Sequence, residues 1–341
     1  MSAYDDEMWL APQYFKAFSC KCGSCRNACC KGWKIAVTRE EYFRLLGLSC
    51  SENLHYKIEG AFGEPEFPTD KKFRYIESDW RGQCRMLDED GLCMIQRECG
   101  ERMIPETCRV YPRCYKRTNG VLRAVCSSSC EAVAEMLMTG EKLVFGELAL
   151  PGRIKPEISE ELPKDSDPLL TESVRLLQDR SRDLSVRIFN VGELLHFSGD
   201  TDVTFERLLG VLECLIETSG TLNDYASEVF NRYREKNEAG ENLFKTDFWE
   251  FERDYPEWSS FFENIIVNSI FYSSFPYCDK RIEADEALWG LLMQYKLLKL
   301  ICTACTRDEP SLEKFADSVA AVYHLVEHTS FYYNAFRLLS E

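Results

Sequence analysis

The sequence predicts a mainly α protein in which a cysteine-rich metal-cluster domain, made of short helices and turns, is followed by an α-helical domain. The first observation is the cysteine distribution, since thirteen of the 17 cysteines lie between Cys20 and Cys130. The second is that helical periodicity prevails from Pro168 onward, with little of the alternation that marks strands. We therefore divide the chain into a metal domain at residues 1–145, a proline-rich linker at 146–167 and a helical domain at 168–341.

The first domain needs something to hold its thiols, because the chain shows no sign of export. Its N-terminal residues are acidic and aromatic rather than basic and then apolar, unlike a secretory signal. We expect a cytoplasmic protein, in which thiols stay reduced and an unprotected thiol is open to oxidation. Between Cys20 and Cys30 five thiols fall within 11 residues. Thiolates this crowded repel one another unless a bound cation shares them, so the sequence predicts metal ligation.

Three groups of cysteines are the candidate metal ligands. They are Cys20, Cys22, Cys25, Cys29 and Cys30; Cys84, Cys93, Cys99, Cys108 and Cys114; and Cys126 and Cys130. Structural zinc sites usually show two compact Cys-x2-4-Cys pairs, whereas these cysteines are widely scattered. Adjacent thiols such as Cys29 and Cys30 cannot easily bind one tetrahedral ion, but they can serve different irons of one cluster or of two. We therefore expect iron–sulfur; zinc and a disulfide framework are the alternatives.

Local patterns place helices in both domains. Thr38 and Glu41 form a capping box that opens a helix through Leu46, and an apolar face after Cys130 predicts another helix. Four prolines and several acidic residues in 151–168 predict an extended linker or a loop over the surface. Beyond it, apolar spacing predicts helices at residues 169–195, 204–219, 222–236, 258–272, 282–302 and 311–339.

The net charge of −16 is carried by the second part of the chain, because residues 1–140 contain 20 basic and 20 acidic side chains. An acidic surface disfavours nucleic acid and could attract a lysine-bearing protein, although solvated faces of amphipathic helices produce the same excess. No stretch reaches the roughly 20 consecutive apolar residues of a membrane span. We expect neither a nucleic acid nor a membrane as partner.

A few residues outside the cysteine-rich part are candidates for chemistry. His324 and His328 are four residues apart, so they share one face of a helix, with Glu327 alongside. They could bind a metal or act as a base, although packing is the commoner role of such a pair. Cys302 and Cys305 form an isolated Cys-x2-Cys, and two thiols without further ligands more often pack in a helix than chelate a metal.

The order of these motifs resembles the flagellin lysine N-methylases, within the wider group of CxxCxxCC-type iron–sulfur or zinc proteins. The resemblance starts at Cys20-x4-Cys25-x3-Cys29-Cys30, followed by Lys31-Gly32-Trp33, and continues through GQC at Cys84, LDEDGLC at Cys93, ETCRVYPR at Cys108 and Cys130 before an apolar helix. Three later segments, LLQDRSRDLSVR, FFENIIVNSIFYSSFPY and YHLVEHTSFYYNAF, extend the resemblance over nearly the whole chain.

This resemblance implies an enzyme that transfers methyl groups from S-adenosylmethionine to lysines of flagellin or a similar protein. It implies eight ligands that suffice for one or two [4Fe–4S] clusters, namely Cys20, Cys25, Cys29, Cys30, Cys84, Cys93, Cys108 and Cys130. Cys22, Cys99, Cys114 and Cys126 are extras, which either ligate a further site or are buried thiols. The alternative is an iron–sulfur or zinc redox, sensor or peptide-maturation protein without lysine methylase activity.

Two arginines are candidates for holding the methyl donor. Arg109 and Arg113 belong to the CRVYPR element, where an arginine could bind the carboxylate of S-adenosylmethionine or tune a cluster; they could instead offset thiolate charge. The sequence has no Gly-x-Gly turn of the dinucleotide type, and the Cys-x3-Cys-x2-Cys motif of radical enzymes fails because residue 32 is glycine. No catalytic residue is predicted, but the substrate amine must arrive deprotonated and in line with the methyl group.

Overall fold

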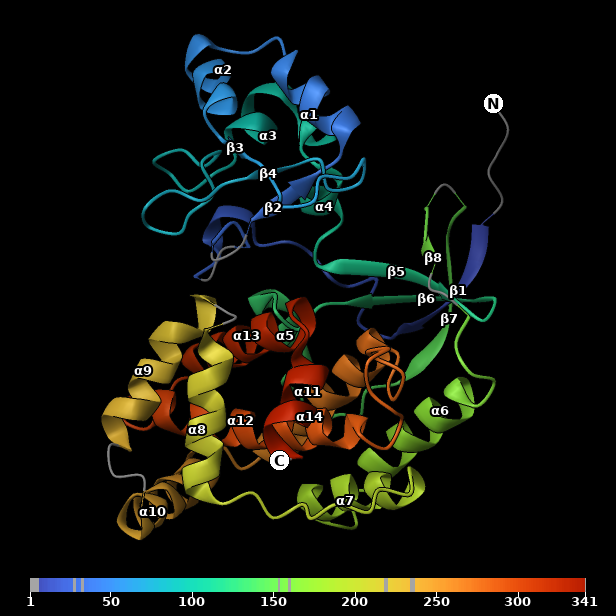
Figure 1. Cartoon of the computed structure of the whole chain (residues 1–341), viewed down its shortest axis with the longest axis vertical. Helices are drawn as coiled ribbons and strands as arrows, with labels where there is room; N and C mark the ends of the chain where they lie inside the picture. The colour runs from blue at the N-terminus through green and yellow to red at the C-terminus, as the bar shows by residue number, and fades with distance from the viewer. Residues whose placement is uncertain are drawn as a thin grey trace. The chain divides into compact units, whose positions relative to one another are not determined.

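The computed structural model describes residues 6–26, 29–31, 34–152, 154–158, 161–217, 220–233 and 237–340. Its contacts divide the chain into two compact units (Figure 1). We call Cys20–Tyr111 the cysteine-rich unit, and Met1–Ser19 together with Pro112–Glu341 the helical unit. These bounds differ from the predicted domains, because the first strand and residues 112–145 belong with the helices, and residues 146–167 contain strands.

A five-stranded sheet in the helical unit accounts for the difference. Its order is β7-β1-β6-β5-β8, with β1 (Asp6–Pro12), β5 (Arg113–Thr118), β6 (Val121–Cys126), β7 (Phe145–Pro151) and β8 (Glu157–Ile158). β1 pairs in parallel with β6, where Leu10 faces Arg123, and antiparallel with β7 along its whole length. The β5–β6 hairpin turns at Asn119 and Gly120, whose φ angles of 48° and 81° are those that a tight two-residue turn requires.

Helices make up the rest of the helical unit. They are α5 (Glu131–Leu137), α6 (Ser166–Leu177), α7 (Leu184–Leu194), α8 (Phe205–Ile216), α9 (Asn223–Arg232), α10 (Glu238–Asp254), α11 (Trp258–Ser273), α12 (Ala287–Thr306), α13 (Leu312–His328) and α14 (Phe331–Leu339). The prediction of a mainly α chain is confirmed. The predicted helices at 169–195 and 311–339 are each divided in two, and α10 lies between the predicted ones. No helix in the described ranges is both long and apolar enough to cross a membrane.

Helices α11 and α12 form the centre of the helical unit because they are apolar on nearly all sides. Residues 261–271 of α11 are all buried, and α12 buries 17 of its 20 residues. One polar side chain of this core, Asn264 of α11, has several partners. The amide of Asn264 donates to the backbone carbonyls of residues 137, 139 and 141, at 3.2, 3.0 and 2.8 Å. This side chain therefore fixes the turn that follows α5.

The cysteine-rich unit has a small core of its own. Its strands are β2 (Ile35–Val37), β3 (Phe62–Gly63) and β4 (Arg74–Ile76), in the antiparallel order β2-β4-β3; its α-helices are α1 (Arg39–Leu46), α2 (Glu52–Glu59), α3 (Met94–Cys99) and α4 (Glu106–Val110). Val37, Leu45, Leu54 and Ile58 are fully buried between these elements. Several partly buried cysteines pack around this apolar core.

The predicted capping box is present at the start of α1. Thr38 Oγ1 accepts the N–H of Glu41 at 3.1 Å, and Glu41 Oε2 accepts the N–H of Thr38 at 2.8 Å. Two donors that the helix cannot satisfy itself are thereby paired. Glu41 Oε1 also accepts the N–H of Glu106 at 2.7 Å. The cap therefore ties α1 to the start of α4.

Candidate functional site

Five cysteines of the cysteine-rich unit lie close enough to influence one another's ionisation. We call them the thiol group: Cys29, Cys30, Cys84, Cys93 and Cys108. They come from three separate parts of the chain. The N–H of Cys84 donates to the carbonyl of Cys30 at 2.7 Å, Cys93 forms an isolated bridge with Leu87, and Cys108 lies in α4. Backbone contacts therefore bring together thiols that are far apart in sequence.

The turn before Cys93 follows from its sequence, DEDGLC. Asp88 Oδ1 accepts the N–H groups of Asp90 and Leu92, both at 2.9 Å, which is the local bonding that favours aspartate in turns. Gly91 has a φ of 75°, a conformation that glycine adopts without the steric cost of a side chain. The turn therefore places Cys93 directly before the first residue of α3.

Burial and mutual repulsion raise the pKa of most thiols in this group. Burial raises the pKa of Cys84 to about 11, and nearby thiolate charge adds to the effect. Burial likewise holds the pKa of Cys108 well above its usual range. Cys29 is the exception, because the Cys30 thiol donates a hydrogen bond that lowers the pKa of Cys29 and raises that of Cys30. A bound cation would offset both the cost of burying the thiolates and their mutual repulsion, because it takes the place of the protons and screens the negative charges.

The first predicted ligands stand at the edge of this arrangement. Cys20 and Cys22 are exposed and Cys25 is partly buried. The N–H of Cys22 donates to the Cys20 sulfur at 3.3 Å. Burial, and to a smaller extent the charge of Cys29, raise the pKa of Cys20. Residues 32–33 of the recognised motif lie outside the described residues.

Cys99 lies with a cysteine that the sequence analysis does not assign. Its thiol donates to the carbonyl of Ser49 at 3.9 Å. Burial raises the pKa of the neighbouring Cys50, and the charge of Cys99 adds to this effect. The structure therefore groups Cys99 with Cys50 at the start of α2.

The last three predicted ligands belong to the helical unit. Cys114 lies in β5, Cys126 ends β6 and Cys130 precedes α5. Burial raises the pKa of Cys126, and the charges of Cys130 and Cys114 raise it further, whereas Arg113 lowers it. The twelve predicted ligands are thus divided between the two units.

The spacing of the described ligand side chains does not suit a single ion. Within the described ranges, no group of three or more His, Cys, Asp or Glu side chains is placed to hold one metal ion. Zinc binds thiolate sulfur at about 2.3 Å, which brings its ligands to roughly 4 Å from one another. A cluster instead distributes its thiolates over several irons. An all-sulfur set such as the thiol group suits either metal by chemistry.

A buried network around Glu327 connects the loop at residues 127–129 to helix α13. Ser127 Oγ donates to Glu327 Oε2 at 2.5 Å. Ser129 Oγ lies 2.5 Å from Ser127 Oγ and 2.8 Å from His328 Nε2. Because each hydroxyl has one hydrogen, donation by Ser127 to Glu327 requires Ser129 to donate to Ser127 and His328 Nε2 to donate to Ser129. The four side chains therefore form one directed hydrogen-bond chain that ends on the carboxylate.

The same loop is fixed from its other side. Asn268 of α11 donates to the Cys126 carbonyl and to Ser128 Oγ, both at 2.9 Å. Its amide oxygen accepts the hydroxyl of Tyr14 at 2.6 Å, and Tyr14 follows β1. Both side chains are buried. The network is therefore held by segments from the beginning, middle and end of the helical unit.

Burial sets the protonation of this network. It raises the pKa of Glu327 to about 8, although hydrogen bonds from Ser127 and the loop backbone and the charge of Lys116 act in the opposite direction. Burial lowers the pKa of His324 to about 4 and that of His328 to about 3, so both rings are neutral at pH 7. Glu327 Oε1 is shielded from solvent and accepts no hydrogen bond from a described residue.

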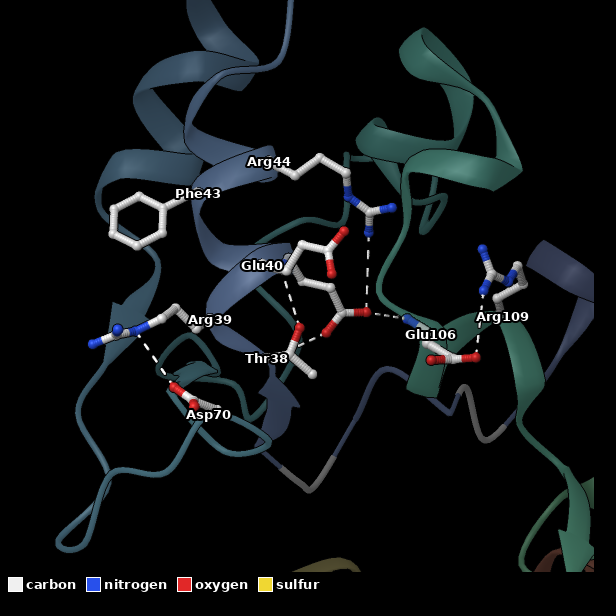
Figure 2. A pocket seen from close by; sticks show the side chains of 9 residues that line it. Thr38, Arg39, Glu40, Phe43, Arg44, Asp70, Glu106 and Arg109 are labelled. Carbon is white, nitrogen blue, oxygen red and sulfur yellow. Dashed lines mark hydrogen bonds and ion pairs between the residues drawn. The ribbon is translucent and has the colours of Figure 1, made fainter. Parts of the chain in front are cut away.

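Arg109 lines a pocket of about 590 Å³ in the cysteine-rich unit (Figure 2). Arg39 pairs with Asp70 at 3.5 Å, and Arg109 pairs with Glu106 at 3.7 Å. Phe43, which is 59% exposed, also lines the pocket. The pocket thus combines cations, carboxylates and an accessible aromatic ring.

Arg113 lies in the helical unit and has a different environment. It donates to the carbonyl of Phe18 at 3.2 Å, and its guanidinium lies 4.8 Å from the centroid of the Phe18 ring. Its charge lowers the pKa of Cys126. The roles predicted for Arg113 stay predictions.

Cys302 and Cys305 pack within α12, as expected for thiols without further ligands. Cys302 is fully buried, and the Cys305 thiol donates to the carbonyl of Tyr225 at 3.8 Å. Burial raises the pKa of both.

Comparison with known proteins relates the second part of the chain to one family. Residues 201–340 match the family described as the FliB lysine N-methylase C-terminal domain. The chain is 27% identical over 136 residues to a Lysine-N-methylase of Salmonella typhimurium, covering 37% of this chain and 31% of that protein. It is 27% identical over 146 residues to the Flagellar biosynthetic protein FliU of Salmonella muenchen, covering 40% of this chain and 80% of that protein.

A Lysine-N-methylase of Salmonella choleraesuis matches to the same extent as that of Salmonella typhimurium, 27% over 136 residues. The match spans about a third of the length of these two proteins. No solved structure matches the chain. Glu327 and His328 lie inside the region that the family covers, and the thiol group lies outside it.

Proposed function

We propose that the chain is an S-adenosylmethionine-dependent lysine N-methyltransferase acting on flagellin or a similar protein, because residues 201–340 match the FliB lysine N-methylase C-terminal domain and the relatives that it resembles include a Lysine-N-methylase. The matched region comprises α8 to α14 and includes Glu327. The network around Glu327 is the observation that carries the proposal, because it offers a proton acceptor within the part of the chain that the family covers.

Methyl transfer to lysine requires such an acceptor. A lysine ε-amine has a pKa of about 10.4 and arrives protonated, so a proton must leave before the nitrogen attacks the sulfonium methyl. Glu327 Oε1 is the proposed acceptor, since no described donor occupies it. Only the ionised carboxyl can take the proton, so with a pKa of about 8 the fraction of protein that is competent for transfer rises as pH increases through that value. Ser127 holds the other oxygen, Oε2, and so orients the carboxylate. His328 supports Ser127 through Ser129 and acts as a positioning residue.

For the methyl donor, Arg109 remains the proposed partner of its carboxylate. S-adenosylmethionine has a carboxylate, an ammonium, a sulfonium and an aromatic base. The pocket of Figure 2 presents arginines, carboxylates and the ring of Phe43, which match these groups in chemistry.

We propose that the thiol group holds a [4Fe–4S] cluster. Four thiolates bind one such cluster, and the thiol group contains five cysteines that influence one another's ionisation. A bound cluster would supply folding free energy to the cysteine-rich unit. Zinc in this place is the alternative that metal analysis distinguishes.

The proposed function is tested with the full chain, purified without oxygen and mixed with S-adenosylmethionine carrying a labelled methyl group and with purified flagellin. Mass spectrometry then locates the label on lysine. Glu327→Gln keeps the size of the side chain but cannot take the proton, so we expect the rate of transfer to fall by about a hundredfold or more. Its metal content should stay unchanged.

Glu172→Gln is the matched control, because Glu172 lies on α6 in an exposed ion pair with Arg175 and should keep the normal rate. A normal rate in Glu327→Gln would refute the acceptor. Absence of transfer by the unchanged protein would refute the function itself.

A further inference from the structure

A second pocket, in the helical unit, has a chemistry that the proposed function does not use. It is a cavity of about 280 Å³ lined by residues of α8, α10 and α12, three helices that are labelled in Figure 1. Phe205 of α8 and Phe244 of α10 stack there with ring centroids 5.6 Å apart, and Phe248 lies next to Phe244. Tyr295 of α12 completes the aromatic lining. The walls therefore favour an apolar, and above all an aromatic, occupant.

Two lysines of α12 also face this cavity. Lys296 and Lys299 are three residues apart and so lie on one side of the helix. Lys296 Nζ donates to the carbonyl of Val203 at 3.4 Å. Lys299 Nζ lies 3.7 Å from the centroid of the Phe248 ring and 5.5 Å from that of Tyr295. Neither ammonium forms an ion pair with a carboxylate among the described residues.

The local charge of the pocket is opposite to that of the whole chain. The chain carries a net charge of −16, yet the pocket is lined by three lysines and a single acidic residue, Glu241. Lys245 already pairs with Glu241 at 2.7 Å. The carboxylates nearest in charge to the other two lysines are Asp202 for Lys296 and Glu252 for Lys299, and neither lines the pocket. Burial lowers the pKa of both lysines and outweighs the opposing charges of Asp202 and Glu252, because a partly buried cation is costly. A bound anion would stabilise the two charged ammonium groups and so offset the cost of burying them.

We propose that this pocket binds a small organic acid, in which the carboxylate meets Lys296 and Lys299 and an aromatic or branched aliphatic group packs against Phe205, Phe244 and Phe248. The volume supports a small ligand, since it lies just below the roughly 300–1,000 Å³ of typical ligand pockets. A cationic ligand is disfavoured by the lysines. The site is separate from Glu327, so it adds a ligand to the protein rather than a step to the proposed reaction.

The test uses 3-phenylpropionate as the probe and isothermal titration of the full chain. The matched neutral probe is 3-phenylpropanamide, and the matched cation is 3-phenylpropylamine. We expect the acid to bind at least about tenfold more tightly than the amide, because a charge-assisted hydrogen bond contributes at least that much. We expect the amine to bind more weakly still.

Lysine variants then locate the site. Lys299→Met and Lys296→Met should each weaken binding of the acid about tenfold. Lys314→Met, which removes an exposed lysine paired with Glu309, should leave it unchanged. Equal affinity for acid and amide, no binding of the acid up to about 10 mM, or unchanged affinity in both pocket variants would overturn the proposal. Methyl transfer by Lys299→Met is measured as well. Failure of acid binding and failure of methyl transfer are then read from separate assays, so the two proposals stand or fall independently.

Discussion

Changing Glu263 to Gln should lower the free energy of unfolding of the helical unit by about 3–5 kcal/mol. Glu263 lies on α11 with its side chain fully buried, and Arg187 of α7 is only 5% exposed. Arg180 forms two parallel hydrogen bonds to the carboxylate, both 2.9 Å long, and Arg187 Nη1 donates to it at 2.5 Å. One carboxylate thus compensates two guanidinium groups.

The expected loss follows from what the variant leaves behind. Glutamine fills the same space but brings no charge, so Arg187 stays buried without an anion and close to Arg180. Its remaining bonds, to the carbonyls of Leu177 at 2.9 Å and Arg182 at 2.7 Å, satisfy donors but do not compensate the charge. Breaking a buried pair in this way is far more costly than deleting an exposed one.

Urea unfolding followed by circular dichroism measures the loss, since most of the helix is in the helical unit. Glu172→Gln is the matched control, because it also removes a carboxylate bound by an arginine, but at a side chain 39% exposed. We expect the control to lose at most about 0.5 kcal/mol. If Glu263→Gln lost less than about 1 kcal/mol, or no more than Glu172→Gln, the reasoning would fail.

Three further predictions concern other parts of the chain. Thr38→Ala removes the capping box of α1 and should destabilise the cysteine-rich unit by about 1 kcal/mol in urea unfolding; no measurable change would contradict the cap's role. The double change Cys29→Ser and Cys30→Ser should remove bound metal, whereas Cys214→Ser, at an exposed thiol, should not; metal analysis decides, and metal retained by the double variant would refute the ligand assignment. Folded Glu327, with its pKa raised from 4.5 to about 8, keeps a proton that the unfolded chain has released, so its contribution to stability falls as pH rises between these values, by about 1.4 kcal/mol per pH unit. Glu327→Gln should lack this fall, and unfolding measured at pH 5 and pH 8 would show whether it does.

Helices were predicted well where neighbouring residues in the sequence determine them. The apolar runs of α11 and α12 and the capping box of Thr38 and Glu41 are local signals, and each appears in the structure. Helix α10 has such a signal in Phe244, Phe248 and Phe251, spaced four and three residues apart, but many charged residues obscure it.

The sheet and the unit boundary depend on contacts that no local pattern specifies. β1 lies at the start of the chain and pairs with β6 and β7 far along it. The Asn119-Gly120 pair, between the two short segments that form β5 and β6, was the local sequence feature that indicated a hairpin. Residues 146–167 resemble a linker when the strands that pair with them are unknown. Their prolines and acidic residues are typical of exposed segments.

The candidate site shows the same limit. Adjacent cysteines are visible in the sequence, but their gathering with Cys84, Cys93 and Cys108 depends on contacts between separate segments, such as that of Cys84 with Cys30. The pairing of Ser127 with Glu327 joins residues 200 positions apart, so the sequence could offer only His324, Glu327 and His328 as a local group. The fold places the loop with Ser127 and Ser129 beside helix α13, and these hydroxyls join Glu327 and His328 in one hydrogen-bond network.

The most direct measurement of the central claim is methyl transfer by the unchanged protein. The full chain, purified without oxygen and analysed for iron and sulfide, is incubated with S-adenosylmethionine and flagellin, and the flagellin peptides are examined by mass spectrometry. We expect methyl groups on lysine side chains, formed only when protein and donor are both present. Flagellin left unmodified by protein that carries its full complement of metal would contradict it.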